Sequence, residues 1–138
     1  MLGIMFSILV WTVSPQTPFI YIFLVFFASV FIDFDHYICA VNKTRKLGLL
    51  ESFGYHKKRE EELQKYEGKH GKTRGDFHIF HTIEFHALMA ILGILWIPVF
   101  YLFIGTTFHS FLDLFDMLAK GKIHRREYFF FNWLREKF

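Results

Sequence analysis

The chain has 138 residues, of which 53% are hydrophobic and 21% aromatic, a size that fits one domain (1–138). Its single cysteine, Cys39, excludes an intrachain disulfide. The 16 Lys and Arg residues lie in two blocks, 43–74 and 120–137, which is typical of the loops of a helical membrane protein and disfavours a nucleic acid partner.

Four apolar crossings can be drawn along the chain. Leu2–Val13 is short, because 12 helical residues cover ~18 Å of a hydrocarbon core that is ~30 Å thick. After the breaking sequence SPQTP, Phe19–Ala40 is long enough to span. The run Phe77–Met117 has the length of two crossings, and we expect the break at Pro98, since proline removes a backbone donor. A single helix kinked at Pro98 is the alternative.

Two polar segments complete the chain. Residues 43–76 are strongly charged, and we expect a partly helical, solvated loop. Residues 120–138 place basic side chains beside aromatic ones in HRREYFFFNWLREKF, which favours an amphipathic helix on the membrane surface over a disordered tail. Because residues 1–42 contain no Lys or Arg, both basic segments are expected in the cytoplasm.

The predicted fold is therefore all-α: a polytopic, four-helix transmembrane bundle of two hairpins with an interfacial C-terminal helix. We expect it in the cell (inner, cytoplasmic) membrane, in contact with membrane lipid, with a homo-oligomer left open.

Ionisable residues recur at one depth of this bundle. Counting ~1.5 Å per helical residue from the two outer turns brings them to the inner part of the cytoplasmic leaflet. Buried acids are costly in lipid, and each is a functional candidate. They are Asp33, Asp35 and His36; His78, His81, Glu84 and His86; and His109, Asp113 and Asp116.

Helical spacing predicts which of these side chains share a face. His81 and Glu84 are three residues apart, and His109 and Asp113 are four apart, so each pair is expected on one side of its helix. Imidazole and carboxylate on facing helices form metal sites in helical bundles. The bland alternative is that each residue only anchors, caps or hydrogen-bonds a helix. His56, His70 and His124 are interpreted as solvated loop residues.

The combined set favours a divalent cation, most simply Zn²⁺, with Mn²⁺ or Fe²⁺ as alternatives. The predicted ligands are Asp35, His36, His81, Glu84, His109 and Asp113. A nearby carboxylate, Glu84 or Asp33, is predicted to act as general base on water.

The order DFDH, then FHTIEF, then FHSFLDL resembles the membrane-bound, metal-dependent hydrolase family, also described as LexA-binding, inner-membrane-associated hydrolases. Members of that family resemble four-helix membrane proteins with D-x-D-H ending the second helix and H-x-x-x-D in the fourth. The first motif falls here on Asp33, Asp35 and His36, and the last falls on His109 and Asp113.

The middle motif departs from the form H-R-G-x-T-H-S of many members. His81 and His86 keep its spacing, while the variant form F-H-T-x-E-F favours His81 with Glu84. Many members also carry a Thr-His pair in the first helix, and Leu2–Val13 has no histidine.

The expected function is metal-dependent hydrolysis at the cytoplasmic interface of the membrane, acting on a lipid-like phosphoester. Two rival interpretations remain: a metal or proton transporter subunit, and a structural or regulatory protein whose metal only joins helices. The outer halves of the predicted spans are nearly all apolar, which argues against a polar path across the membrane.

Overall fold

The computed structural model describes residues 2–138, and these form an all-helical fold in which no strand occurs, as predicted. Seven α-helices and two 3₁₀ turns follow one another along the chain. They are α1 (Leu2–Val13), α2 (Phe19–Phe31), α3 (Phe34–Thr44), α4 (Leu49–His70), η1 (Ile79–His81), α5 (Ile83–Leu95), α6 (Ile97–Ala119), η2 (Ile123–Arg125) and α7 (Phe130–Lys137).

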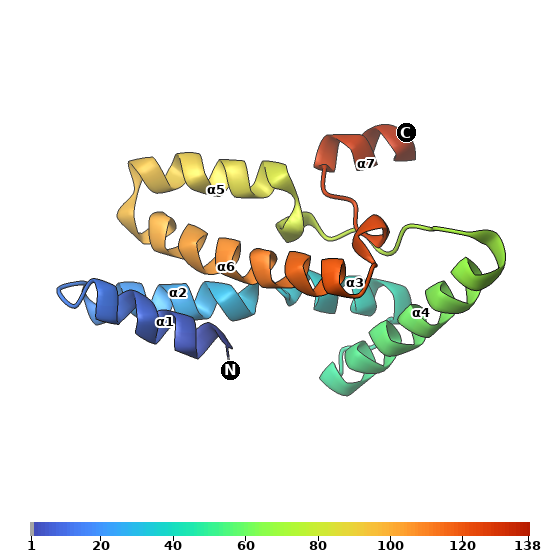
Figure 1. Cartoon of the computed structure of the whole chain (residues 1–138), viewed down its shortest axis with the longest axis horizontal. Helices are drawn as coiled ribbons and strands as arrows, with labels where there is room; N and C mark the ends of the chain where they lie inside the picture. Colours follow the sequence, from blue (N-terminus) through green and yellow to red (C-terminus); the bar gives the residue numbers. More distant parts are fainter. Residues whose placement is uncertain (1) are drawn as a thin grey trace.

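Two antiparallel hairpins, α1/α2 and α5/α6, pack side by side through α2 and α6 (Figure 1). Their tips lie at the same end, where the Thr17 hydroxyl is 3.5 Å from the Tyr101 hydroxyl. The second hairpin turns at Trp96, and Pro98 occupies the first turn of α6, where its missing N–H costs nothing. The predicted break at Ile97-Pro98 is confirmed, and the single kinked helix is excluded.

The contact between α2 and α6 is close because small residues face each other. Val25 and Ala28 are buried in this contact. A Cβ added to Gly105 of α6 would lie only 2.3 Å from the carbonyl oxygen of Val25. Glycine therefore allows the two backbones to approach, and this approach determines the distance between the polar groups one turn further along.

Two helical stretches are long and apolar enough to cross a membrane. Phe19–Thr44 (26 residues) combines α2 and α3, which a short turn at Ile32 and Asp33 separates, and Ile97–Ala119 (23 residues) is α6. The helices α1 and α5 are apolar but shorter. Large apolar side chains project outward from the hairpins; Ile94, for example, is 84% exposed.

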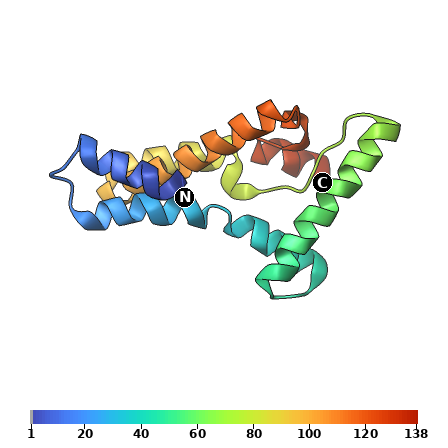
Figure 2. The ribbon, with the colours of Figure 1, turned by 60° about the horizontal axis from the view of Figure 1, so that its bottom comes forward.

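The polar segment 43–76 is more regular than expected, since 22 of its residues form α4, which projects away from the hairpins (Figure 2). The tail returns to it: Arg125 and His124 both pair with Glu67. The end of the tail forms α7, whose Trp133 stacks on Phe77 with ring centroids 4.3 Å apart. The predicted C-terminal helix is therefore present, in place of a disordered tail.

Candidate metal centre

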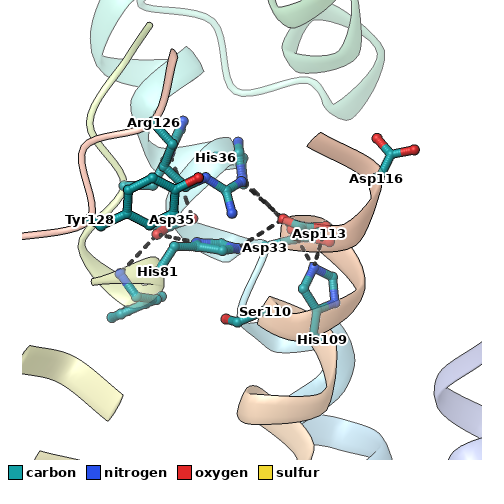
Figure 3. A network of polar contacts seen from close by, with 12 residues as sticks. Asp33, Asp35, His36, His81, His109, Ser110, Asp113, Asp116, Arg126 and Tyr128 are labelled. Carbon is teal, nitrogen blue, oxygen red and sulfur yellow. Dashed lines mark hydrogen bonds and ion pairs between the residues drawn. The ribbon is translucent and has the colours of Figure 1, made fainter. Parts of the chain in front are cut away.

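Three segments of the chain, residues 33–36, 81 and 109–113, converge where α2 passes into α3 (Figure 3). The turn after α2 presents Asp33, and the first turn of α3 presents Asp35 and His36. The turn η1 presents His81. The middle of α6 presents His109 and Asp113.

The first ligand group consists of Asp33, His81, His109 and Asp113, whose ligand atoms all lie within 4.8 Å of one another. His109 Nε2 is 3.2 Å from Asp33 Oδ1 and 3.5 Å from Asp113 Oδ1. His81 Nε2 is 3.4 Å from Asp113 Oδ2. Two imidazole nitrogens and two carboxylates thus face one small volume.

The histidines of this group are held by their other nitrogen. His109 Nδ1 lies 2.6 Å from the backbone carbonyl oxygen of Ser29, to which only an Nδ1–H can donate. His81 Nδ1 lies 3.3 Å from Asp35 Oδ2, which also accepts the N–H of Phe80. A carbonyl or carboxylate behind the imidazole is the arrangement that orients metal-binding histidines.

The two imidazole nitrogens aimed into this volume make no hydrogen bond in the described part of the chain, although carboxylate oxygens lie 3.2–3.5 Å away. His81 Nε2 and His109 Nε2 are both buried and unsatisfied. Burying such a nitrogen unpaired costs about 1–3 kcal/mol, so it calls for a partner. A divalent cation satisfies both nitrogens and neutralises the two carboxylates, and the donor set suits one.

A second ligand group, Asp35, His36 and His81, adjoins the first. The buried His78 belongs to its surroundings, with Nδ1 3.8 Å from Asp35 Oδ1. Burial lowers the pKa of His78 to about 3, so its imidazole is neutral. Because His81 faces this group with Nδ1 and the first group with Nε2, and a neutral imidazole has one free lone pair, it can serve only one group at a time.

Glu84 stands outside both groups. Its carboxylate accepts the backbone N–H groups of Phe130 (2.9 Å) and Phe131 (3.4 Å) at the start of α7. The predicted shared face with His81 is wrong, because Thr82 has an extended backbone, caps α5 and separates His81 from the helix that carries Glu84. Glu84 thus anchors the tail, and the structure brings together the other five predicted ligands and Asp33.

His86, Asp116, His56 and His124 have separate partners, while His70 is exposed at the end of α4. His86 Nε2 lies 2.8 Å from the Ser110 hydroxyl. Asp116 is exposed and pairs with Lys120. His56 Nε2 contacts the His36 carbonyl at 2.9 Å, and His124 contacts Glu67, so these two histidines are not free loop residues. Their bonds link α4 to α3 and the tail to α4.

Two contributors to the site were not predicted. Arg126 donates to Asp113 Oδ2 at 2.9 Å and brings a positive charge to the edge of the first group. Its only signal in the sequence is a basic tail, which does not distinguish it from Arg125. The Ser29 carbonyl has no signal at all, because any residue supplies a backbone oxygen.

The chain matches no protein-family model, no curated protein and no solved structure. The chemistry of the site is therefore inferred from its own geometry.

Proposed function

We propose that this protein is a membrane-embedded, metal-dependent hydrolase that acts at the cytoplasmic interface on a lipid phosphoester. The observation that carries the proposal is the pair of buried, unpartnered nitrogens, His81 Nε2 and His109 Nε2, facing the carboxylates of Asp113 and Asp33. The order of the three motifs, with its resemblance to the membrane-bound hydrolases, supports the same class.

In this proposal His81, His109 and Asp113 hold a divalent ion. Two histidines with carboxylate suit Zn²⁺, and Mn²⁺ or Fe²⁺ are the alternatives. Bound there, the ion supplies a Lewis acid that polarises a phosphoryl oxygen and stabilises transition-state charge. The Ser29 carbonyl and Asp35 keep both imidazoles aimed at it.

Asp33 is the proposed general base. It is the most exposed member of the group, with 53% of its side chain accessible, so water reaches it. It lies on the turn between α2 and α3, opposite Asp113 across His109. Arg126, at the edge of the group, favours a negatively charged phosphoester.

Elemental analysis of the protein purified without chelators tests the metal. Since His81 serves one group at a time, we expect one tightly bound ion per chain. Asp113→Asn should lower metal content and phosphoesterase activity together, while Glu61→Gln, which also replaces a carboxylate by an amide but at an exposed position of α4, should lower neither. Metal flux into liposomes without turnover of any lipid would favour a transporter, and metal with neither activity would favour a structural role.

The proposed topology places α1, α2 with α3, α5 and α6 in the bilayer, and α4 and α7 on the cytoplasmic side. The shared end of the two hairpin tips and the basic character of the opposite end support it. Single cysteines introduced at Glu61 and Gln16, in a Cys39→Ser background, should be labelled from opposite sides of intact cells. Labelling of both from one side would refute the topology.

A further inference from the structure

An apolar groove of about 690 Å³ leads away from the first ligand group, between α1 and α6 with α2 as its floor. Its polar lining consists of Ser29, Asp33, His109, Asp113 and Asp116. The walls beyond are apolar, and the volume lies in the ~300–1,000 Å³ range of small-molecule sites. The wall residues include Leu2, Ile4, Phe26, Val30, Phe108 and Phe115.

The groove is open toward the surroundings of the bundle. Leu2 and Val30 are each 57% exposed, and Phe115 is 67% exposed, although all three line it. In the proposed topology these side chains face hydrocarbon, so a lipid chain can enter sideways without crossing water. A groove that is polar at one end and apolar along its length matches the profile of an amphiphile.

A stacked aromatic pair closes the apolar end. Phe6 of α1 and Phe108 of α6 lie with ring centroids 3.8 Å apart and planes 2° from parallel. Phe108 lines the groove, while Phe6 lines a second apolar cavity of about 400 Å³ that continues toward the hairpin tips past Val10, Tyr101 and Ile104. The pair therefore separates two cavities that lie in line along one seam.

The charges at the polar end select the headgroup. The carboxylates of Asp33 and Asp113 balance the charge of a divalent ion, and Asp116, which also lines the groove, is paired with Lys120. Arg126, 2.9 Å from Asp113, adds a positive charge that the Asp35 carboxylate beside His81 offsets. The Arg126 guanidinium, which hydrogen-bonds Asp113 at this end, complements an anionic phosphoryl group.

We propose that this groove binds the hydrocarbon chain of a phosphoester lipid, and that the Phe6–Phe108 pair limits the length of the chain. The proposal rests on the hydrolase function and gives its substrate class: a single apolar chain with an anionic phosphoryl head at the ligand group. A chain longer than the groove must displace the stacked rings to reach the second cavity.

The test measures binding of n-alkylphosphonates, whose carbon–phosphorus bond is not hydrolysed, to Zn²⁺-loaded protein in detergent by native mass spectrometry. Methyl-, octyl- and hexadecylphosphonate are compared in wild type and Phe6→Ala. The variant-to-wild-type affinity ratio for each probe cancels its partition into the micelle. We expect a ratio near one for the methyl and octyl probes and a gain of about tenfold for the hexadecyl probe (~1.4 kcal/mol).

Two further variants keep the result unambiguous. Phe111→Ala makes the same change in α6 at an exposed position that lines neither cavity, and it should leave all three ratios at one. Ile4→Trp, at a 51% exposed groove position, should weaken octylphosphonate binding and spare methylphosphonate. If Phe6→Ala does not fold, Ile4→Trp decides alone.

Equal ratios for all chain lengths in Phe6→Ala, or unchanged octyl binding in Ile4→Trp, would overturn the groove. The affinity ratios can be measured on protein with Zn²⁺ and on protein without it, so they do not depend on whether the metal is bound. Chain-length selection without turnover of octyl phosphate would refute hydrolysis and leave the groove in place. Turnover of phosphoesters with no chain-length effect would refute the groove and leave the hydrolase function in place.

Discussion

The substitution Gly105→Ala tests whether the packing of α2 on α6 controls the metal centre. Gly105 faces Val25, and one turn further along each helix His109 faces Ser29. The two contacts share one helical register, since both pairs are four residues apart. A methyl group at position 105 should therefore change the distance between His109 and Ser29.

The size of the effect follows from the distances. The new Cβ would lie 2.3 Å from the Val25 carbonyl oxygen, whereas ordinary contact begins at 3.4 Å, so the helices must separate by about 1.1 Å. Carried one turn along, this lengthens the contact between His109 Nδ1 and the Ser29 oxygen from 2.6 Å to about 3.7 Å, beyond a hydrogen bond.

The expected outcome is a loss of metal affinity of about 10- to 100-fold, the usual effect of removing a partner that orients a metal-binding histidine. Overpacking should also lower the free energy of unfolding by about 1–3 kcal/mol. Zn²⁺ affinity is measured by competition with a chromophoric chelator, and stability by thermal unfolding of the chelator-treated protein in detergent.

Gly93→Ala is the matched control. Its Cβ would lie 3.0 Å from the Phe100 backbone, between α5 and α6, so it strains a helix contact that does not hold His109. It should lower stability and leave Zn²⁺ affinity unchanged. Folded Gly105→Ala protein with wild-type affinity, or equal affinity losses in both variants, would show that this packing does not position the site.

Three other outcomes are expected. His81→Ala should reduce bound Zn²⁺ to background, because both ligand groups lose a nitrogen, whereas His86→Ala should retain it; equal losses would contradict the assignment. Hydrogen bonds from an arginine and a histidine of the tail lower the pKa of Glu67 to about 2, from an ordinary 4.5. The ionised Glu67 carboxylate therefore contributes fully to docking of the tail above pH 4.5, and this contribution is lost as the pH falls through about 2. Protection of the Gly75 amide from hydrogen exchange should fall over the same pH range, because this amide donates to the Arg125 carbonyl of the tail. Glu67→Gln should remove this pH dependence of amide protection. Glu84→Gln should increase amide exchange across α7 without changing metal content. A loss of bound metal in this variant would show that Glu84 is a metal ligand.

The helices were predictable because strong local signals coincide with them. Leu2–Val13 is an uninterrupted apolar run bounded by SPQTP, and Pro98 can begin a helix but not continue one. The convergence of the polar groups was also readable, since the hairpins alternate in direction and residue counts along a helix measure depth. These inferences need only the period and rise of a helix.

The errors lie where one residue changes the backbone. A helix drawn continuously through 77–95 puts His81 and Glu84 on one face, but Thr82 adopts an extended conformation with its hydroxyl accepting the N–H of Phe85. Because of this cap, His81 lies before α5 and points toward the ligand groups, whereas Glu84 lies in the first turn of α5 and binds the tail. Threonine is an ordinary cap residue, yet an apolar run on both sides hides the signal.

The short helix α1 shows how an element without ligands can still shape the site. It carries no ionisable side chain, and at ~18 Å it is shorter than a membrane core. Gly3 nevertheless packs so closely that a Cβ there would lie 2.3 Å from the Ser29 hydroxyl oxygen, and the carbonyl of the same Ser29 orients His109. This short helix therefore contacts Ser29 through Gly3 and places Phe6 against Phe108. Only the first residues of α1, Leu2, Gly3 and Ile4, line the groove, so this helix shapes the site through its first turns and not through its full length.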